Sequence, residues 1–120
     1  MLNARKKDIH DRIYKFVIKV LEEINKLPAT PENLILRKQC ARSVTSTGAN
    51  AVEADGAESK RDFIHKFTIS KKESKETLYW LNVISDHNSQ SKLKFLSLIK
   101  ENQEIIAIIS KIIINSKKNK

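Results

Sequence analysis

The chain has 120 residues, and 23 Lys and Arg against 14 Asp and Glu give it a formal net charge of +9. This length is typical of one domain, here residues 1–120, and the single cysteine excludes an internal disulfide and a cysteine-based zinc cluster. The basic balance favours an anionic partner, most commonly nucleic acid, with a solvated lysine-rich surface as the alternative. Neither a signal peptide nor an apolar run of about 18 residues is found, so we expect a cytoplasmic protein with no membrane partner.

Two helices are predicted in the first half of the chain. Apolar residues recur every three or four positions over about residues 8–27, with charged residues between them, which is typical of an amphipathic helix. Both prolines lie in the short connection that follows. Thr30 is then a suitable N-cap, and Pro31 a suitable first residue, for a second helix over about residues 31–54. Such a short connection predicts that the two helices run antiparallel.

Small residues mark the middle of the second and third predicted helices. In the second helix, Cys40 is interpreted as a small buried hydrophobe at the edge of a stripe of small side chains that includes Gly48. The third helix is predicted over about residues 60–84, starting from a capping pattern at Ser59. Its core-facing middle is hydroxylated, with Ser70, Ser74 and Thr77. We therefore expect these two helices to approach closely, with Gly48 near their crossing.

The last predicted helix is unusually apolar. Polar residues 85–91 predict a loop, a fourth helix follows over about residues 92–115, and residues 116–120 form a basic tail. Its isoleucines fill a sector of about 160°, wider than the roughly 100° that one core needs. They are Ile105, Ile106, Ile108, Ile109, Ile112 and Ile113. We predict that they contact a second subunit in a homo-oligomer, with a helix surrounded on all sides inside one bundle as the alternative.

These elements predict an all-α fold, an antiparallel up-down-up-down four-helix bundle that assembles into a homo-oligomer. No metal-binding spacing is found, because none of the three histidines follows a Glu by three residues, and no cofactor is predicted. No catalytic residue is predicted either, so we expect a protein that is not an enzyme. Acid–base chemistry by Glu53 and Glu73 is the weaker alternative, because no nucleophile or phosphate-binding loop accompanies them.

A polar network is predicted between the second and third helices. A carboxylate on the flank of the core needs a partner, so we expect Glu73 to pair with Arg42 or with a neighbouring subunit. Ser46 and Asn50 are positioned to join that network, since a buried amide must also be hydrogen-bonded.

Basic residues crowd the same two helices. They are Arg37, Lys38 and Arg42 on the second helix and Lys60, Arg61, Lys66, Lys71, Lys72 and Lys75 on the third. They are not interleaved with exposed aromatic residues, which argues against base stacking on single strands. We expect sequence-tolerant, salt-sensitive binding to nucleic-acid backbones, with an ordinary solvated face as the alternative.

With these features in place, the chain resembles the four-helix-bundle proteins encoded in intervening sequences of 23S ribosomal RNA genes. The helix-two pattern of that family is matched by Leu36, Gln39, Arg42, Ser43, Asn50, Glu53 and Gly56, and the helix-three run by Ser70, Glu73 and Glu76. The likeness covers about residues 9–110. The chain departs from the family at Thr47-Gly48, where isoleucine-proline is usual, and at Ala54-Asp55, which separate Glu53 from Gly56.

The resemblance implies a homopentamer with a basic surface. It also implies kinship with the accessory proteins of diversity-generating retroelements, which bind nucleic acid and a reverse transcriptase. We therefore expect a non-enzymatic oligomer that binds RNA or DNA and acts as an accessory or scaffold for an RNA or a reverse transcriptase. The alternative is a protein-interaction adaptor with no nucleic-acid role.

Overall fold

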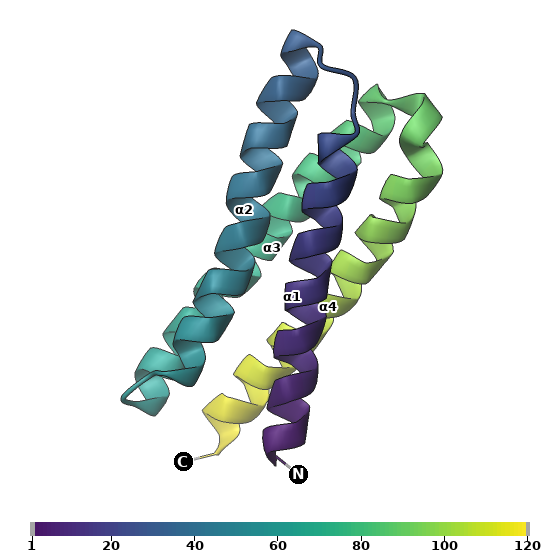
Figure 1. Cartoon of the computed structure of the whole chain (residues 1–120). Helices are drawn as coiled ribbons and strands as arrows, with labels where there is room; N and C mark the ends of the chain where they lie inside the picture. The colour runs from purple at the N-terminus through teal and green to yellow at the C-terminus, as the bar shows by residue number, and fades with distance from the viewer. Residues whose placement is uncertain (1, 120) are drawn as a thin grey trace.

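The computed structural model describes residues 2–119 of the chain, and the side chains of residues 9–119. Four long helices account for most of this range: α1 (Leu2–Asn25), α2 (Pro31–Asp55), α3 (Lys60–His87) and α4 (Lys92–Lys118). A single 3-10 turn, η1 (Ser89–Ser91), precedes α4. The prediction of an all-α chain with four helices is confirmed (Figure 1).

The helices form an elongated bundle of 50 × 22 × 19 Å. The connection from α1 to α2 and the corner from α3 to α4 lie at one end of the bundle, and the turn from α2 to α3 lies at the other (Figure 1). α3 packs most extensively on α2 and then on α4, while α1 lies against α2 and α4. Within the described residues, none of the helices combines the length and the apolar character that a membrane crossing needs.

Local capping signals set the starts of α2 and α3. The Thr30 side chain accepts a hydrogen bond from the backbone N–H of Asn33 at 3.1 Å, and the Ser59 side chain accepts one from Asp62 at 3.0 Å. Both satisfy N–H groups that a helix start leaves without a partner. The starts predicted at residues 31 and 60 are therefore found.

The other helix ends differ from the prediction. α1 begins at Leu2 rather than near residue 8. It ends at Asn25, and a tighter turn with hydrogen bonds to carbonyls three residues back follows before Pro28. α3 continues to His87 through residues predicted as a loop, and the buried Ser85 lies on its inner side. α4 continues through most of the predicted basic tail as far as Lys118, and Lys120 lies outside the described residues.

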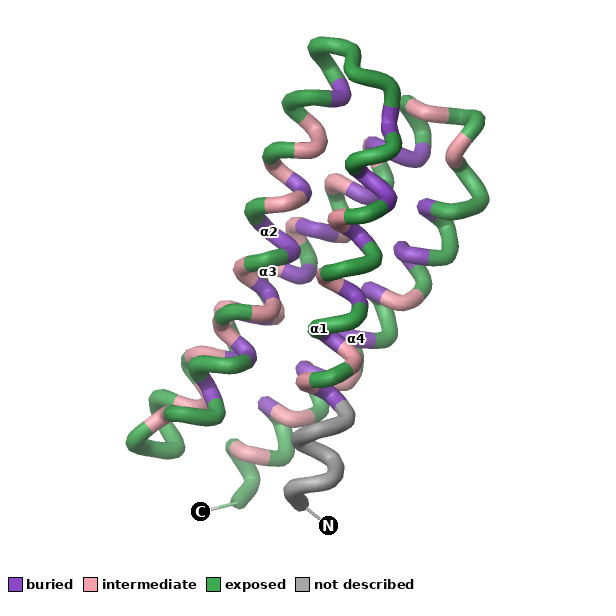
Figure 2. Tube along the Cα trace, in the orientation of Figure 1, coloured by how far each residue is buried: buried purple, intermediate pink, exposed green. Residues whose placement is uncertain are grey.

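The core runs along the inner side of all four helices (Figure 2). Ile105 and Ile109 have no exposed surface within this single chain, and Ile113 is also buried. The prediction that these three contact a second subunit is therefore wrong, because α3 and α1 already cover their side of α4. The other isoleucines of the set, Ile106, Ile108 and Ile112, are half-buried.

Hydroxyl groups let α2 and α3 pack closely. The hydroxyls of Ser43 and Thr77 lie 2.8 Å apart across the interface, and the Ser70 hydroxyl donates to the backbone carbonyl of Thr47 at 2.7 Å. A serine can reach the backbone of a neighbouring helix only where the two helices lie close together, so the predicted close approach is confirmed.

Gly48 faces a different side of α2. A Cβ atom at this position would lie 3.4 Å from Val17 Cγ2 and 3.7 Å from Ile13 Cγ2, and both residues belong to α1. Gly48 follows Thr47, whose carbonyl accepts from Ser70, so it lies near the contact with α3 as predicted, but the space it leaves faces α1. The small residue therefore accommodates side chains of α1.

Candidate nucleic-acid interface

The outer face of α3 carries a continuous line of exposed side chains, which we call the α3 stripe. Its members recur at alternating spacings of four and three residues: Arg61, His65, Thr68, Lys72, Lys75, Tyr79 and Asn82. This spacing keeps all of them on one side of a helix. Among the side chains of residues 9–119, no carboxylate lies within 4 Å of the charged groups of Arg61, Lys72 or Lys75. The stripe is therefore a row of positive charge without ion-pair partners.

Two of the predicted cations, Arg42 and Lys66, form ion pairs with carboxylates of the same chain, unlike those of the α3 stripe. Arg42 Nη1 lies 3.3 Å from Glu73 Oε1, and its Nη2 contacts Glu76. Lys66 Nζ lies 2.8 Å from Glu53 Oε1. The hydrogen bond to Glu76 raises the pKa of Arg42, and the hydrogen bond to Glu53 raises the pKa of Lys66. Both cations link α2 to α3 and are poor candidates for binding phosphate.

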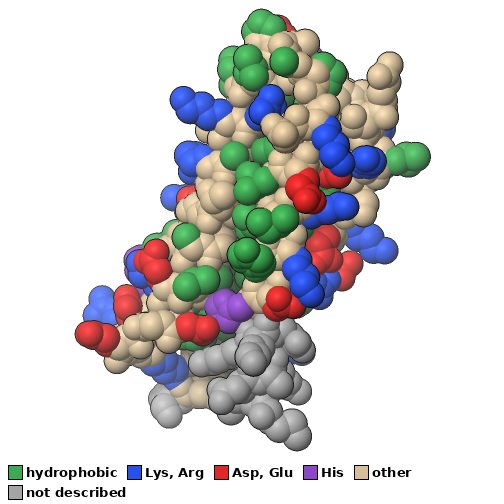
Figure 3. All heavy atoms as spheres, in the orientation of Figure 1, with side chains coloured by type: hydrophobic (Ala, Val, Ile, Leu, Met, Phe, Trp, Pro, Cys, Tyr) green, Lys and Arg blue, Asp and Glu red, His purple; other side chains and the backbone are tan. Residues whose placement is uncertain are grey.

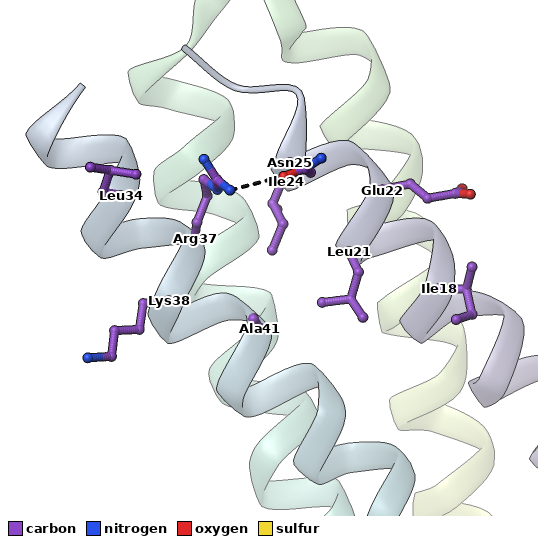
Figure 4. Close-up of a pocket in the computed structure, with 9 residues that line it drawn as sticks. All are labelled: Ile18, Leu21, Glu22, Ile24, Asn25, Leu34, Arg37, Lys38 and Ala41. Atoms are coloured by element: carbon purple, nitrogen blue, oxygen red, sulfur yellow. Dashed lines mark hydrogen bonds between the residues drawn. The ribbon is translucent and has the colours of Figure 1, made fainter. Parts of the chain in front are cut away.

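The remaining predicted cations occupy scattered positions. Arg37 Nη2 donates to Asn25 Oδ1 at 3.0 Å, whereas the Lys38 side chain borders the same pocket and extends away from α1 (Figure 4). Lys60 is exposed at the first residue of α3, and Lys71 is half-buried beside the α3 stripe. The basic residues predicted on the two helices therefore do not form one patch. Arg61, Lys72 and Lys75 lie in the α3 stripe, Arg42 and Lys66 lie at the contact of α2 with α3, and Arg37 and Lys38 border a pocket between α1 and α2.

The predicted polar network is present in part. The pairing of Arg42 with Glu73 is confirmed, and the network extends to Trp80, whose indole N–H donates to Glu76 Oε2 at 2.9 Å. The hydrogen bond from Trp80, followed by that from Arg42, holds the pKa of Glu76 below its usual value. These contacts fix the carboxylate of Glu76 between an aromatic side chain and a cation.

Other members of the family pattern lie apart from this network. The Asn50 amide donates to the backbone carbonyl of Ser46 at 2.9 Å, one turn earlier in the same helix, so the prediction that these two join Arg42 is wrong. The reason is that a helical Asn can bond the carbonyl four residues back. Gln39 is half-buried on α2.

Tyr79 is the aromatic member of the α3 stripe, and its side chain is 60% exposed. Its ring centroid lies 4.9 Å from that of Trp80, and the two rings meet edge to face at 72°. The prediction that no exposed aromatic accompanies the cations is therefore wrong. The sequence spacing could have indicated this, since Tyr79 follows Lys75 by four residues and Lys72 by seven, which puts all three on one face of a helix.

An apolar groove lies between α1 and α2, and we call it the α1–α2 groove. Apolar side chains gather along this seam (Figure 3). One stretch has a volume of about 580 Å³ and is lined by Ile18, Leu21, Glu22, Ile24, Asn25, Leu34, Arg37, Lys38 and Ala41 (Figure 4). A second stretch of about 450 Å³ includes Tyr14, Val17 and Val52. Exposed apolar side chains therefore line this face of the protomer.

The groups with catalytic potential have structural partners or are buried. Burial raises the pKa of the Cys40 thiol to about 12, so it stays protonated near neutral pH. Glu53 and Glu73, the residues of the enzyme alternative, both form ion pairs with cations of this chain. Among the described residues, no three His, Cys, Asp or Glu side chains come together as metal ligands would. His10 lies 2.9 Å from Asp55, His65 belongs to the α3 stripe, and His87 ends α3.

Comparison with known proteins agrees with the resemblance found in the sequence. Over residues 5–111 the chain matches the family described as 23S rRNA-intervening sequence protein. It is also similar to the crystal structure of a protein with unknown function from the S23 ribosomal protein family of Bacteroides thetaiotaomicron VPI-5482, at 30% sequence identity and a TM-score of 0.82. That likeness covers 90% of this chain and 96% of the other. No curated protein matches the chain significantly. The chain therefore belongs to the 23S rRNA-intervening sequence protein family.

Proposed function

We propose that this protein is a non-enzymatic helical bundle that binds nucleic-acid backbones and acts as an accessory or scaffold for an RNA or a reverse transcriptase. The observation that carries the proposal is the row of cations on α3. Arg61, Lys72 and Lys75 are exposed on one face and have no carboxylate within ion-pair distance among the described side chains. Other cations nearby, such as Arg42 and Lys66, do have such partners. Phosphates can displace the counterions of unpaired cations without breaking an internal ion pair.

We also propose that the protomer is an up-down-up-down antiparallel bundle and that several copies assemble, as a pentamer by family resemblance. The core isoleucines of α4 are not available for such contacts. Large apolar side chains remain exposed along the α1–α2 groove, and Tyr14, Leu34 and Val52 are each more than half exposed. Residues of α1 and α2 alone line both stretches of the groove, so assembly through it does not use the side chains of the α3 stripe.

Salt-dependent binding tests the nucleic-acid proposal. The variant Lys72→Gln/Lys75→Gln removes two unpaired charges of the stripe. The matched variant Lys15→Gln/Lys92→Gln removes two cations that pair with Asp11 and Asp86. Affinity for mixed RNA and DNA probes, measured by fluorescence anisotropy, should fall steeply between about 50 and 200 mM salt, and the stripe variant should show a smaller salt slope. Equal losses in both variants would mean that only overall charge matters and would remove the assignment to α3.

The α1–α2 groove favours a second candidate, a protein-interaction adaptor without a nucleic-acid role. An apolar groove with a mixed rim of Glu22, Arg37 and Lys38 is suited to an amphipathic helix of a protein partner. Binding through such a groove depends on apolar contact and responds weakly to salt. If the protein binds no nucleic acid at about 50 mM salt, where phosphate contacts are strongest, the adaptor becomes the better function.

A further inference from the structure

We propose that the α3 stripe binds single-stranded nucleic acid in particular, with Tyr79 as the side chain on which a base stacks. The inference rests on the proposed function and deepens it, because it specifies that the bound nucleic acid is single-stranded and names the residue on which a base stacks. Three observations carry it: the support of the Tyr79 ring, its place among the cations, and the polar surroundings on its face of the helix.

The first observation is that the side chain of Trp80 contacts and supports the Tyr79 ring. The edge-to-face contact with Trp80, with centroids 4.9 Å apart, supports one side of the ring. Trp80 is itself fixed by its hydrogen bond to Glu76, and Glu76 is fixed by Arg42. An exposed aromatic side chain normally loses rotamer freedom when a ligand binds it. Because the supporting residues already restrict this ring, a stacked base needs to order little more.

The second observation is the register of the stripe. Lys75 and Lys72 precede Tyr79 by one and two helical turns on the same face, about 6 and 10 Å along the axis at about 1.5 Å per residue. Arg61 continues the line to about 27 Å from Tyr79 on the same basis. A strand with one base on Tyr79 can therefore run its phosphates past successive cations, the combination that single-strand binding surfaces use.

The third observation is what surrounds the ring. Apart from Tyr79, every member of the α3 stripe is polar or charged, and the aromatic neighbour of Tyr79, Trp80, is half-buried. The exposed ring is therefore not part of an apolar stripe that a protein helix would cover. In a duplex the faces of the bases are stacked on one another, and a side chain on a helix surface cannot reach them. Tyr79 can therefore add to the affinity for single strands and add nothing to the affinity for duplexes.

Binding assays with matched probes test the inference. The full chain would be titrated into a single-stranded RNA of about 16 nucleotides, the corresponding DNA strand, and the duplexes of each, with affinity read by fluorescence anisotropy. Tyr79→Ala should weaken single-strand binding by about 5- to 150-fold, the range that corresponds to losing one stacked base, and leave duplex binding unchanged. Tyr79→Phe keeps the ring and should retain single-strand affinity.

The chain offers a control in an exposed apolar side chain outside both the α3 stripe and the α1–α2 groove. Leu93 is 83% exposed near the start of α4, so Leu93→Ala should leave single-strand affinity unchanged. Thermal unfolding by circular dichroism and solution mass, measured for each variant, separate a local effect from loss of fold or assembly. If Tyr79→Ala leaves single-strand affinity unchanged, or weakens duplex binding equally, the inference is overturned while backbone binding stands. If no probe binds the wild-type protein, the proposed function fails as well.

Discussion

Asn33 and Asn88 exchange two hydrogen bonds through their side-chain amides. Asn33 Nδ2 donates to Asn88 Oδ1 at 2.9 Å, and Asn88 Nδ2 donates to Asn33 Oδ1 at 3.0 Å. Each amide also donates to a backbone carbonyl, that of Pro28 for Asn33 and that of Ile84 for Asn88. The pair ties the start of α2 to the end of α3, between residues 55 positions apart in the chain.

Removing one member of this pair should destabilise the protein more than an ordinary polar substitution. Asn33→Ala leaves the Asn88 amide without its partner, so we expect a loss of about 1–3 kcal/mol in the free energy of unfolding. Asn88→Ala should cost a similar amount, and the double variant should cost less than the sum, because the two residues share one interaction. Urea unfolding measures all three. The exposed Asn115→Ala is the control, and an equal effect there would contradict the prediction.

Gly48 should tolerate a methyl group but not a larger side chain. A Cβ atom would make ordinary contact with Val17 at 3.4 Å, and replacing glycine inside a helix stabilises it, so Gly48→Ala should raise the unfolding free energy by up to about 1 kcal/mol. Gly48→Leu should lower it by about 1–3 kcal/mol through overpacking against α1. Adding Val17→Ala to the Gly48→Leu variant should recover part of its lost melting temperature. No recovery would show that the clash lies elsewhere.

Sequence reasoning predicted the starts of α2 and α3 because capping is local. Thr30 and Ser59 each bond a backbone N–H only three residues away, so their role can be inferred from a short window. The end of α3 could not be predicted in this way. The helix continues through a polar stretch because Ser85 is buried and because Asn88 meets Asn33, and both facts depend on residues distant in the chain.

The candidate site could likewise be predicted from the sequence only in part. Composition and spacing predicted the cations of α3, but exposure depends on which side of each helix its neighbours cover. Helix α2 has neighbours on two sides, so a stripe of small residues did not determine whether Gly48 faces α1 or α3. In the same way, the sequence placed two aromatic residues side by side, and only the packing left Tyr79 exposed and Trp80 half-buried.

Asn102 offers a test of polar burial in the core. Its amide donates to the backbone carbonyl of Ser74 at 3.0 Å, while its Oδ1 atom is buried with no hydrogen-bond partner among the described residues. Asn102→Leu replaces this group by an apolar one with the same branching and number of side-chain heavy atoms, so it should change the unfolding free energy by less than about 1.5 kcal/mol. Asn102→Ala should lower the unfolding free energy by about 1–3 kcal/mol, because it leaves a cavity and a lost hydrogen bond. Equal losses for both variants in urea unfolding would refute this reasoning.

The location of the exposed apolar side chains predicts which substitutions alter assembly. Val52→Lys places a charge at the α1–α2 groove, so it should reduce the solution mass measured by light scattering while changing the melting temperature of the protomer little. Ile109→Ala acts inside the core instead and should lower the free energy of unfolding by about 2–5 kcal/mol. A Val52→Lys protein with the same mass as wild type would exclude this face as the contact.

Stability should fall in acid partly through Glu23, whose side chain is only 6% exposed. Burial, the largest influence on its pKa, raises it, but the hydrogen bond from Lys26 and the charges of Lys26, Lys94 and Lys19 together outweigh burial and hold the pKa below 4.5. The carboxylate therefore contributes stability above its unfolded-state pKa, and this contribution is lost as the pH falls through the lower folded-state pKa.

Glu23→Gln removes the ionisation and keeps the shape of the side chain. At neutral pH this variant should unfold at a lower urea concentration than wild type, and the difference should shrink as the pH falls below about 4.5, the starting value for a glutamate. Glu76 should behave in the same direction, since hydrogen bonds from Trp80 and Arg42 also lower its pKa. Glu58→Gln, at an exposed position before α3, is the control. A difference between Glu23→Gln and wild type that stays constant across this pH range would show that the loss comes from packing, because only an ionising carboxylate makes the difference depend on pH.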